Sequence, residues 1–344
     1  MNDFSIIPAI NDTVISSRIR FARNLESIPF PYTLLNMENG RETGRDIIRA
    51  INKAINKVQQ FNLYFIENLS GAELALLQEQ YLISKDLMEN SDCGAVFINQ
   101  NESVSIMVNE EDHIREQGFA KGLQLEKVYK ELSVIDNILI SQLPVAFDNE
   151  LGFLTACPTN LGTAMRASVM LFLPALTLDN KIAAIAEFLE KRGITIRGGY
   201  GEGSSADGFM YQLSNMVSLG YSEEKLIQVV LDNVTAICNT EYNARQMLYE
   251  ENKTEITDKC LRAFGVLTNA YKIDTAEFIS LISYVKLGCY LGIIKLKNNN
   301  LLDDLIVSIR PAHINKLSGR DLNPQERDIC RAEHVRNTLS KLKV

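Results

Sequence analysis

The chain changes character at about Glu223, and this change constrains the fold more than any other feature of the sequence. Before it, apolar runs of strand length alternate with longer amphipathic stretches and glycine-rich turns, as in proteins that combine a sheet with helices. After it, helical patterns follow one another with little strand signal. We therefore expect a domain of strands and helices followed by a helical domain, with the border between residues 245 and 265.

Apolar periodicity places the individual elements. The expected strands cover residues 14–21, 95–98, 104–108, 194–197 and 209–214. The expected helices of the first part cover residues 42–60, 119–140, 163–173 and 179–191. Those of the second part cover residues 223–251, 255–271, 274–292, 300–309 and 324–342.

Composition and charge exclude several classes of function. The chain carries 35 Lys and Arg against 43 Asp and Glu, a formal charge of −8, which disfavours binding to nucleic acid or anionic membranes. No apolar run reaches the length of a membrane span, and the N-terminus lacks the pattern of a signal peptide. The six scattered cysteines form no CxxC pair, and the three histidines lack metal-ligand spacing. We expect a cytoplasmic protein in which no side-chain cluster binds a metal.

The first motif is an arginine-rich strand, VISSRIRFARN, at residues 14–24. Side chains alternate along a strand, so Ser16, Arg18 and Arg20 share one face, and Arg23 falls outside their register. The two guanidinium groups in register lie about 6–7 Å apart along the strand, which allows them to bind neighbouring phosphates. The alternative is an edge strand whose polar face meets only water.

A second motif follows the strand expected at 104–108. The sequence NEEDHIR, residues 109–115, places three carboxylates in succession, and Arg115 comes four residues after Glu111. Neighbouring carboxylates repel one another, so they either face water as an acidic turn or hold a cation. In the second case, acid and arginine can face one cleft from opposite sides.

A third motif, CPTNLGTAMRAS at residues 157–168, leads into the helix expected from about Thr163. Arg166 would then lie in the first turn of that helix, where free N–H groups and positive potential attract an anion. The same field would lower the pKa of the Cys157 thiol and make it a candidate thiolate. The alternative is a buried structural cysteine.

The fourth motif is a strand ending in Arg197, followed by a loop with glycines and Glu202 in its middle, RGGYGEGSSADG. Glycines allow a loop to move and allow backbone amides to approach a phosphate. The loop matches neither the Walker A motif nor the glycine patterns of protein kinases and dinucleotide-binding folds. An ordinary surface loop is the alternative.

In this order, the four motifs resemble those of the guanidino (phosphagen) kinase family, over about residues 13–245. The resemblance implies an α+β fold: a mixed, largely antiparallel sheet flanked by helices forms a catalytic domain over residues 1–250, and an all-α domain covers residues 251–344. It also implies ATP as the phosphoryl donor, with Mg²⁺ held mainly by phosphates and water.

The same resemblance assigns roles to residues of this chain. Glu111 matches the base that takes a proton from the acceptor guanidinium, Glu202 a second carboxylate clamp, and Cys157 the thiol that lies against the guanidinium. Tyr81 stands where the family has a histidine next to adenine, and its ring can stack on the base. The positions that match nucleotide-binding residues are Ser16, Ser17, Arg18, Ile19, Arg20, Arg115, Arg166 and Arg197.

The acceptor is expected to be an arginine side chain of a protein. Family members that act on free arginine or creatine carry a helical domain before the first motif. Here only 15 residues precede Ser16. We therefore expect an open site that admits a side chain on a protein.

A motif near the C-terminus supports the same acceptor. RDICRA resembles the RDxxRA motif of the bacterial protein arginine kinases, which implies that Arg327, Asp328 and Arg331 form a second pocket that binds phosphoarginine and regulates activity. A capping box of Asn323 and Glu326 is expected to open the helix that carries this motif. The alternative is a solvated amphipathic helix in which the arginine side chains pair with Glu326 and Glu333.

That resemblance carries expectations about partners as well. It implies a homodimer formed through the C-terminal domain, an activator protein (McsA), the ClpC–ClpP protease and the repressor CtsR, and hence roles in protein degradation and the stress response. Two other functions stay open. One is a small-molecule guanidino kinase, and the other is a catalytically inactive adaptor that binds phosphoarginine, which the tyrosine at position 81 prompts.

Overall fold

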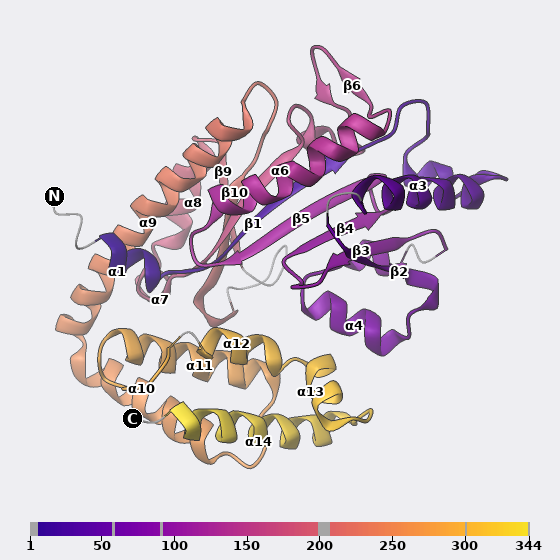
Figure 1. Cartoon of the computed structure of the whole chain (residues 1–344). Helices are drawn as coiled ribbons and strands as arrows, with labels where there is room; N and C mark the ends of the chain where they lie inside the picture. Colours follow the sequence, from indigo (N-terminus) through magenta and orange to yellow (C-terminus); the bar gives the residue numbers. More distant parts are fainter. Residues whose placement is uncertain (1–5, 57–58, 90–91, 199–206, 300, 343–344) are drawn as a thin grey trace.

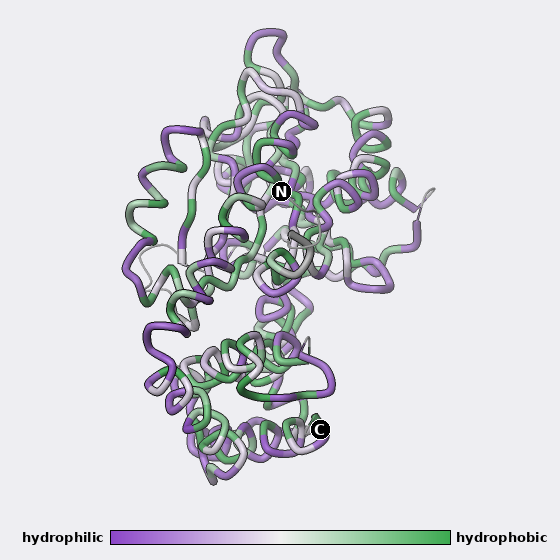
Figure 2. The backbone as a smooth tube through the Cα atoms, turned by 90° about the vertical axis from the view of Figure 1, so that its left-hand side faces the viewer, coloured by the Kyte–Doolittle hydropathy of each residue, from purple (hydrophilic) through white to green (hydrophobic). Residues whose placement is uncertain are grey.

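The computed structural model describes residues 6–56, 59–89, 92–198, 207–299 and 301–342. Two parts lie one above the other in Figure 1, an upper part built around a sheet and a lower part made of helices. Figure 2 shows the same two parts from the side, with the C-terminus in the lower one. No helix in the described ranges is long and apolar enough to cross a membrane.

One eight-stranded sheet organises the upper part. Its strands are β1 (Val14–Arg23), β2 (Phe61–Phe65), β3 (Ala95–Asn99), β4 (Val104–Val108), β5 (Ile114–Lys121), β8 (Met165–Phe172), β9 (Ile194–Gly198) and β10 (Met210–Asn215). They lie in the order β2-β3-β4-β5-β1-β8-β10-β9, and each neighbouring pair is antiparallel. The first strand in sequence, β1, therefore lies in the middle. Two short strands, β6 (Phe147–Asp148) and β7 (Gly152–Phe153), form a separate hairpin.

Helices cover one face of this sheet. Helix α6 (Leu125–Gln142) packs on β5 and β1, α9 (Glu223–Glu251) on β8 and β10, and α8 (Ile182–Glu190) on β9. Ile19 and Phe21 of β1 are buried in the same core, and this burial of apolar surface holds sheet and helices together. The other helices here are α1 (Ile6–Asn11), α2 (Pro31–Leu34), α3 (Gly40–Ile55), α4 (Gly71–Glu79), α5 (Lys85–Glu89) and α7 (Pro174–Leu178), with 3-10 turns at Ile66–Asn68, Pro158–Asn160 and Asp207–Phe209.

The lower part consists of α10 (Lys253–Asn269), α11 (Thr275–Tyr290), α12 (Leu301–Ser308), α13 (Pro311–Ser318) and α14 (Pro324–Leu342). The capping box expected before α14 is confirmed: Asn323 Oδ1 accepts the Glu326 N–H at 3.0 Å, and Glu326 Oε2 accepts the Asn323 N–H at 2.9 Å. The lower part meets the other face of the sheet, where Lys121 of β5 pairs with Asp304 of α12. On that face the segment with α4 and α5 covers β3 and β4.

Two expected helices are wrong in whole or in part. Residues 163–173 form β8 rather than a helix, and the start of the helix expected at 119–140 belongs to β5, so α6 begins only at Leu125. A continuous apolar run of this length suits a strand buried on both faces as well as a helix, and periodicity alone does not separate them. The strand β2 and the helix α13 have no counterpart among the expected elements. The five expected strands and the remaining expected helices are confirmed, with shifted ends.

Candidate active site

Arginines from three neighbouring strands lie on one face of the sheet. Arg20 of β1 lies directly opposite Arg166 of β8, and Ala22 of β1 lies opposite Arg115 of β5. Residues that face each other across an antiparallel pair point to the same side, and alternate residues of one strand do so too. Arg18, Arg20, Arg115 and Arg166 therefore share a side, although they are far apart in the sequence.

The register carries this arrangement across to β9. Gln212 of β10 lies opposite both Arg197 of β9 and Met170 of β8, and Met170 lies opposite Ser16 of β1. Ser16 and Arg197 therefore belong to the same side as the other arginines. We call this surface the arginine face, and its residues are Ser16, Arg18, Arg20, Arg115, Arg166 and Arg197.

Two predicted nucleotide-binding residues point the other way. Ile19 is fully buried in the core on the helix-covered side. Ser17 is also buried, where its Oγ donates to the Gly122 carbonyl at 2.8 Å and accepts the Gln124 N–H at 2.9 Å. These two side chains hold β1 in place and are not brought to the arginine face.

Carboxylates do not balance the positive charge of Arg18 and Arg20. Burial and repulsion from Arg115 and Arg166 lower the pKa of Arg18 to about 10. Burial, Arg18 and the same two neighbours lower the pKa of Arg20 well below its ordinary value. Among the described residues neither forms an ion pair, and the buried Nε of Arg20 has no hydrogen-bond partner. Such a cluster is costly until an anion binds, so the face suits a ligand with several phosphates.

The other arginines of the face have polar partners. Arg115 Nη1 donates to Glu110 Oε2 at 2.7 Å. Arg166 Nε and Nη2 both donate to Ser214 Oγ, at 3.2 and 3.0 Å. Arg197 is exposed near the end of β9. The contacts of Arg115 and Arg166 fix the directions of these two guanidinium groups. Glu202, which follows in the predicted glycine-rich loop, lies outside the described residues.

The acidic turn, residues 109–113, joins β4 to β5 and presents one carboxylate at the edge of the arginine face. Glu110 pairs with Arg115 and Asp112 is buried, whereas the Glu111 side chain is 42% exposed and lies 3.8 Å from Arg115. Partial burial and repulsion from Asp112 and Glu110 raise the pKa of Glu111, against the opposing effect of Arg115. A carboxylate with a raised pKa at an accessible edge suits a proton acceptor.

The remaining residues of the turn hold it in shape. The Asn109 N–H donates to the His113 carbonyl at 3.0 Å and closes the turn, with Asn109 at a positive φ of 59°. His113 Nδ1 accepts the Leu25 N–H at 3.1 Å, so its proton is on Nε2, which donates to the Pro29 carbonyl at 2.9 Å. Burial lowers the pKa of His113 and keeps it neutral. Glu111 is thus the residue of this turn that is free to act on a ligand.

The cysteine loop, residues 154–164, lies against the acidic turn. The Ala156 N–H donates to Asp112 Oδ1 at 2.8 Å. This bond joins the residue before Cys157 to the residue after Glu111. Two of the three side chains that the sequence assigns to the acceptor, Glu111 and Cys157, therefore come from segments in direct contact.

Cys157 itself is half-buried, with its Sγ 3.0 Å from Thr159 Oγ1. The expectation that a helix N-terminus activates this thiol is wrong, because a 3-10 turn at Pro158–Asn160 and then strand β8 follow the cysteine. Arg166 consequently reaches the site from a strand rather than from the first turn of a helix. The Cys157 thiol, in a loop that contacts the acidic turn, remains a candidate contact for a cation.

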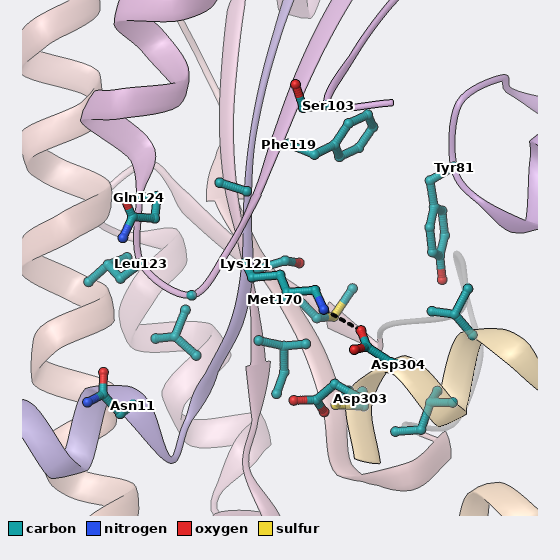
Figure 3. A pocket seen from close by; sticks show the side chains of 18 of the residues that line it. Asn11, Tyr81, Ser103, Phe119, Lys121, Leu123, Gln124, Met170, Asp303 and Asp304 are labelled. Carbon is teal, nitrogen blue, oxygen red and sulfur yellow. Dashed lines mark hydrogen bonds and ion pairs between the residues drawn. The ribbon is translucent and has the colours of Figure 1, made fainter. Parts of the chain in front are cut away.

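A cavity of about 960 Å³ lies between the arginine face and the lower part (Figure 3). Ser16, Phe119 and Met170 line it from the sheet, and the ring of Tyr81 stands across from them. The guanidinium of Arg310 lies over that ring, 4.8 Å from its centroid, and donates to the Tyr81 hydroxyl. The cavity has a mixed lining, with charged side chains such as Lys121, Asp303 and Asp304 beside apolar and aromatic ones, and it shares Ser16 with the arginine face. Its apolar part, at Phe119, Met170 and Tyr81, suits the base and sugar of a nucleotide.

The C-terminal motif lies in the lower part, on α14. Arg331 is buried, and its guanidinium donates to the Ile309 carbonyl at 2.9 Å and to Asp328 Oδ1 at 2.6 Å. Arg327 is half-buried and donates to the Leu322 carbonyl at 2.8 Å. The structure places the three predicted residues on one helix, and it also shows that Arg331 fixes α14 to the end of α12, at Ile309, and to the segment before α11, at Ile273.

Several residues that shape the site have no role in the sequence-based assignment. Ser214 orients Arg166 from a neighbouring strand, Arg310 reaches Tyr81 from the lower part, and Asn24 connects the acidic turn to the cysteine loop. The polar side chain of Asn24, in an otherwise buried stretch, is the sort of signal that sequence reasoning could have used. The other two depend on tertiary contacts.

The described side chains of this site offer few ligands for a metal ion. Across the described ranges, no group of three His, Cys, Asp or Glu side chains is arranged to hold a metal ion. One buried acceptor, Glu110 Oε1, has no hydrogen-bond partner there. A single carboxylate oxygen beside a phosphate site fits magnesium, which keeps most of its water and phosphate ligands in nucleotide sites.

Two family models cover most of the chain. The ATP:guanido phosphotransferase C-terminal catalytic domain matches residues 42–244. The protein-arginine kinase McsB C-terminal domain matches residues 253–344. Among solved structures, lombricine kinase is 26% identical, with a TM-score of 0.60 over 72% of this chain and 70% of its own. A duplicated taurocyamine kinase from Schistosoma mansoni is 28% identical, with a TM-score of 0.60 over 81% of this chain and 40% of its own.

Curated relatives match at higher identity. The protein-arginine kinase of Clostridium kluyveri is 44% identical over 327 residues, which is 95% of this chain and 94% of the relative. That of Halothermothrix orenii is 41% identical over 331 residues, or 96% of this chain and 93% of the relative. These matches agree with the arginine face, the acidic turn and the helical lower part, and they place the chain in the protein-arginine kinase family, within the guanidino phosphotransferases.

Proposed function

We propose that this protein transfers the γ-phosphoryl group of ATP to the guanidinium of arginine side chains in proteins. The observation that carries the proposal is the unbalanced arginine cluster at Arg18 and Arg20 beside a turn that presents Glu111. One half of this site suits a polyanion, and the other half suits a cation. Family membership adds the identity of the phosphoryl donor and of the acceptor group.

The arginine face would bind the triphosphate of ATP. Phosphoryl transfer passes through a loose transition state in which charge spreads over the phosphoryl oxygens, so fixed positive groups supply most of the catalysis. Arg115 and Arg166 are already oriented by Glu110 and Ser214, and ordering them costs little when the ligand arrives. The base and sugar would occupy the cavity beside Tyr81.

Glu111 would act on the acceptor. A guanidinium is a poor nucleophile because its charge is delocalised and its pKa is high. As the N–P bond forms and the bond from phosphorus to the ADP oxygen breaks, the attacking nitrogen loses a proton, and the Glu111 carboxylate would take it. Cys157 and Glu202 would complete the surroundings of the acceptor cation.

Magnesium would be held mainly by phosphate oxygens and water. Glu110 Oε1 is the described protein atom that fits a role as acceptor from a metal-bound water, because it is buried, lies beside Arg115 and has no other described partner. The ion would supply additional charge neutralisation for the phosphates when bound.

The lower part would regulate activity. We propose domains at residues 1–250 and 251–344, with Arg327, Asp328 and Arg331 as a pocket for phosphoarginine. Exposed apolar side chains such as Leu261 and Tyr271 offer surface for a homodimer contact there. The activator McsA, the ClpC–ClpP protease and the repressor CtsR, with roles in degradation and the stress response, are proposed from family resemblance. All six cysteines are free thiols, which agrees with a cytoplasmic location.

A kinetic assay with two acceptors tests the function. ADP release should require a protein with exposed arginines, and Glu111→Gln should reduce it by about two to four orders of magnitude because the proton acceptor is lost. A protein substrate with all arginines changed to lysine is the matched control acceptor. Faster turnover with free arginine than with protein would favour a small-molecule guanidino kinase. Absence of turnover with either acceptor, with phosphoarginine still bound, would favour an inactive adaptor.

A further inference from the structure

Arg23 and Asn24 stand at the end of the arginine-rich motif, and the proposed chemistry uses neither of them. Both side chains are buried, at 0% and 2% exposure. We propose that Asn24 is a positioning residue: it locks the acidic turn that carries Glu111 to the cysteine loop that carries Cys157, and Arg23 anchors it. This inference rests on the proposed function for its catalytic consequence, and on the contacts alone for its structural one.

All hydrogen bonds of the Asn24 side chain go to these two segments. Its Nδ2 donates to Asp112 Oδ1 at 2.6 Å in the acidic turn and to the Leu154 carbonyl at 3.0 Å in the cysteine loop. Its Oδ1 accepts the His113 N–H at 2.9 Å. One side chain therefore uses both ends of its amide to hold two segments that are about forty residues apart in sequence.

Asp112 completes the connection. The oxygen that accepts from Asn24 also accepts the Ala156 N–H at 2.8 Å. Asp112 is next to Glu111 in the chain, and Ala156 is next to Cys157. These bonds therefore fix the distance between Glu111 and the cysteine loop, which would lie on opposite sides of the substrate guanidinium. The rate of phosphoryl transfer is sensitive to this distance.

Arg23 anchors the same corner from the helix-covered side. Its Nε and Nη2 donate to both oxygens of Asp136 on α6, at 2.9 and 2.8 Å. Its Nη1 donates to the carbonyl of Thr163, at the end of the cysteine loop, at 3.0 Å. The next residue, Ala164, has a positive φ of 50° and accepts the Ala22 N–H at 3.1 Å. Arg23 thus holds the strained turn from which β8 starts toward Arg166.

Asn24 is the better residue to test, because removal of Arg23 would leave Asp136 buried without its partner and threaten the fold. The variant is Asn24→Ala, and Asn99→Ala is its matched control. Asn99 is also 2% exposed. Its Nδ2 donates to Ser103 Oγ and its Oδ1 accepts the Val104 N–H, but its side chain contacts neither the acidic turn nor the cysteine loop.

Two measurements on the full chain are independent of turnover. The rate of Cys157 alkylation by iodoacetamide, read by peptide mass spectrometry, and amide hydrogen exchange of residues 154–161 should both rise by about ten-fold or more in Asn24→Ala. Both should stay at the wild-type level in Asn99→Ala. Unchanged alkylation and exchange in Asn24→Ala would overturn the inference, whether or not the protein has kinase activity.

A kinetic measurement separates positioning from simple loss of folded protein. In Asn24→Ala, kcat should fall by about 10- to 100-fold while KM for ATP stays within about two-fold, because the arginine face is intact. In Asn99→Ala kcat should match the wild type once normalised to folded protein; KM for ATP is left out of this comparison because Asn99 bonds to Ser103, which lines the cavity. Equal effects of the two variants on kcat would overturn the positioning role. If alkylation and exchange rise as expected in Asn24→Ala but the wild-type protein transfers no phosphate, the inference stands and the proposed function fails.

Discussion

The two faces of β1 carry charge in opposite ways. On the open face, which is the arginine face, Arg18 and Arg20 repel their neighbours and form no ion pair among the described residues. On the helix-covered face, Arg23 is fully buried, its Nε and Nη2 donate to the two carboxylate oxygens of Asp136, and its Cζ lies 3.7 Å from the centroid of the Phe153 ring. Burial affects the arginines of both faces, so the two faces differ in whether a carboxylate balances the positive charge. A satisfied buried charge indicates a structural role, and an unsatisfied one indicates a missing ligand.

The sharpest way to break this comparison is to remove a charge from the open face. Arg20→Gln should lower kcat by about three orders of magnitude or more, since the group meets the transferring phosphoryl. The free energy of unfolding should stay the same or rise slightly, because repulsion with Arg18, Arg115 and Arg166 is relieved. Steady-state kinetics and urea unfolding on one preparation measure both. A large loss of stability with little loss of activity would contradict the account.

The reverse pattern is expected on the covered face. Arg23→Met should lower the free energy of unfolding by about 3 to 5 kcal/mol, because Asp136 is left buried without its partner. A double variant, Arg23→Met with Asp136→Leu, removes both charges and should recover much of the loss. Urea titration of the single and double variants gives the comparison. A single variant as stable as the wild type would show that this pair does not support the fold.

A third prediction concerns pH and the same covered cluster. Burial and the charge of Asp136 raise the pKa of Glu116 well above its ordinary value, against the opposing effect of Arg23. The folded state therefore holds a proton that the unfolded state releases first, so this stabilisation is complete at low pH and is lost as pH rises toward the folded pKa. Glu116→Gln, which cannot ionise, should gain about 1 kcal/mol or more over the wild type between about pH 5 and about pH 8. Parallel stability curves for the two proteins would refute the buried proton.

The smallest expected effect tests the nucleotide end of the open face. Tyr81→His loses the hydroxyl that accepts from Arg310 and part of the stacking surface. The Kd for ATP should rise by about two- to ten-fold, the size of one aromatic contact. Calorimetric titration with ATP and magnesium measures it, and Tyr64→His, on the distant edge strand β2, is a matched control. An unchanged Kd would place the base elsewhere.

Much of this could be predicted from sequence because alternation along a strand is a local property. The shared face of Arg18 and Arg20, and the exclusion of Arg23 from it, both follow from a period of two and agree with the observed register. The C-terminal helices and the capping box at Asn323 are local in the same sense. The roles of the four motifs came from the family resemblance, because local patterns do not assign them.

The failures came from contacts that are distant in sequence. The run from Met165 to Phe172 was expected as a helix because nothing in it shows that β1 and β10 pair with it on both sides. The helix-terminus argument for Cys157 failed with it. Asn24 and Ser214 act on segments that only the tertiary structure brings to them. Sequence patterns thus identified the charged groups of the site better than the neutral ones that hold them.

The measurement that tests the central claim most directly is peptide mass spectrometry after incubation of the wild-type protein with ATP, magnesium and a protein substrate. The account predicts acid-labile phosphate on arginine side chains, absent without ATP and reduced to background with Glu111→Gln. Phosphate on serine, threonine or tyrosine alone, or phosphoarginine that persists at the wild-type level in Glu111→Gln, would contradict it.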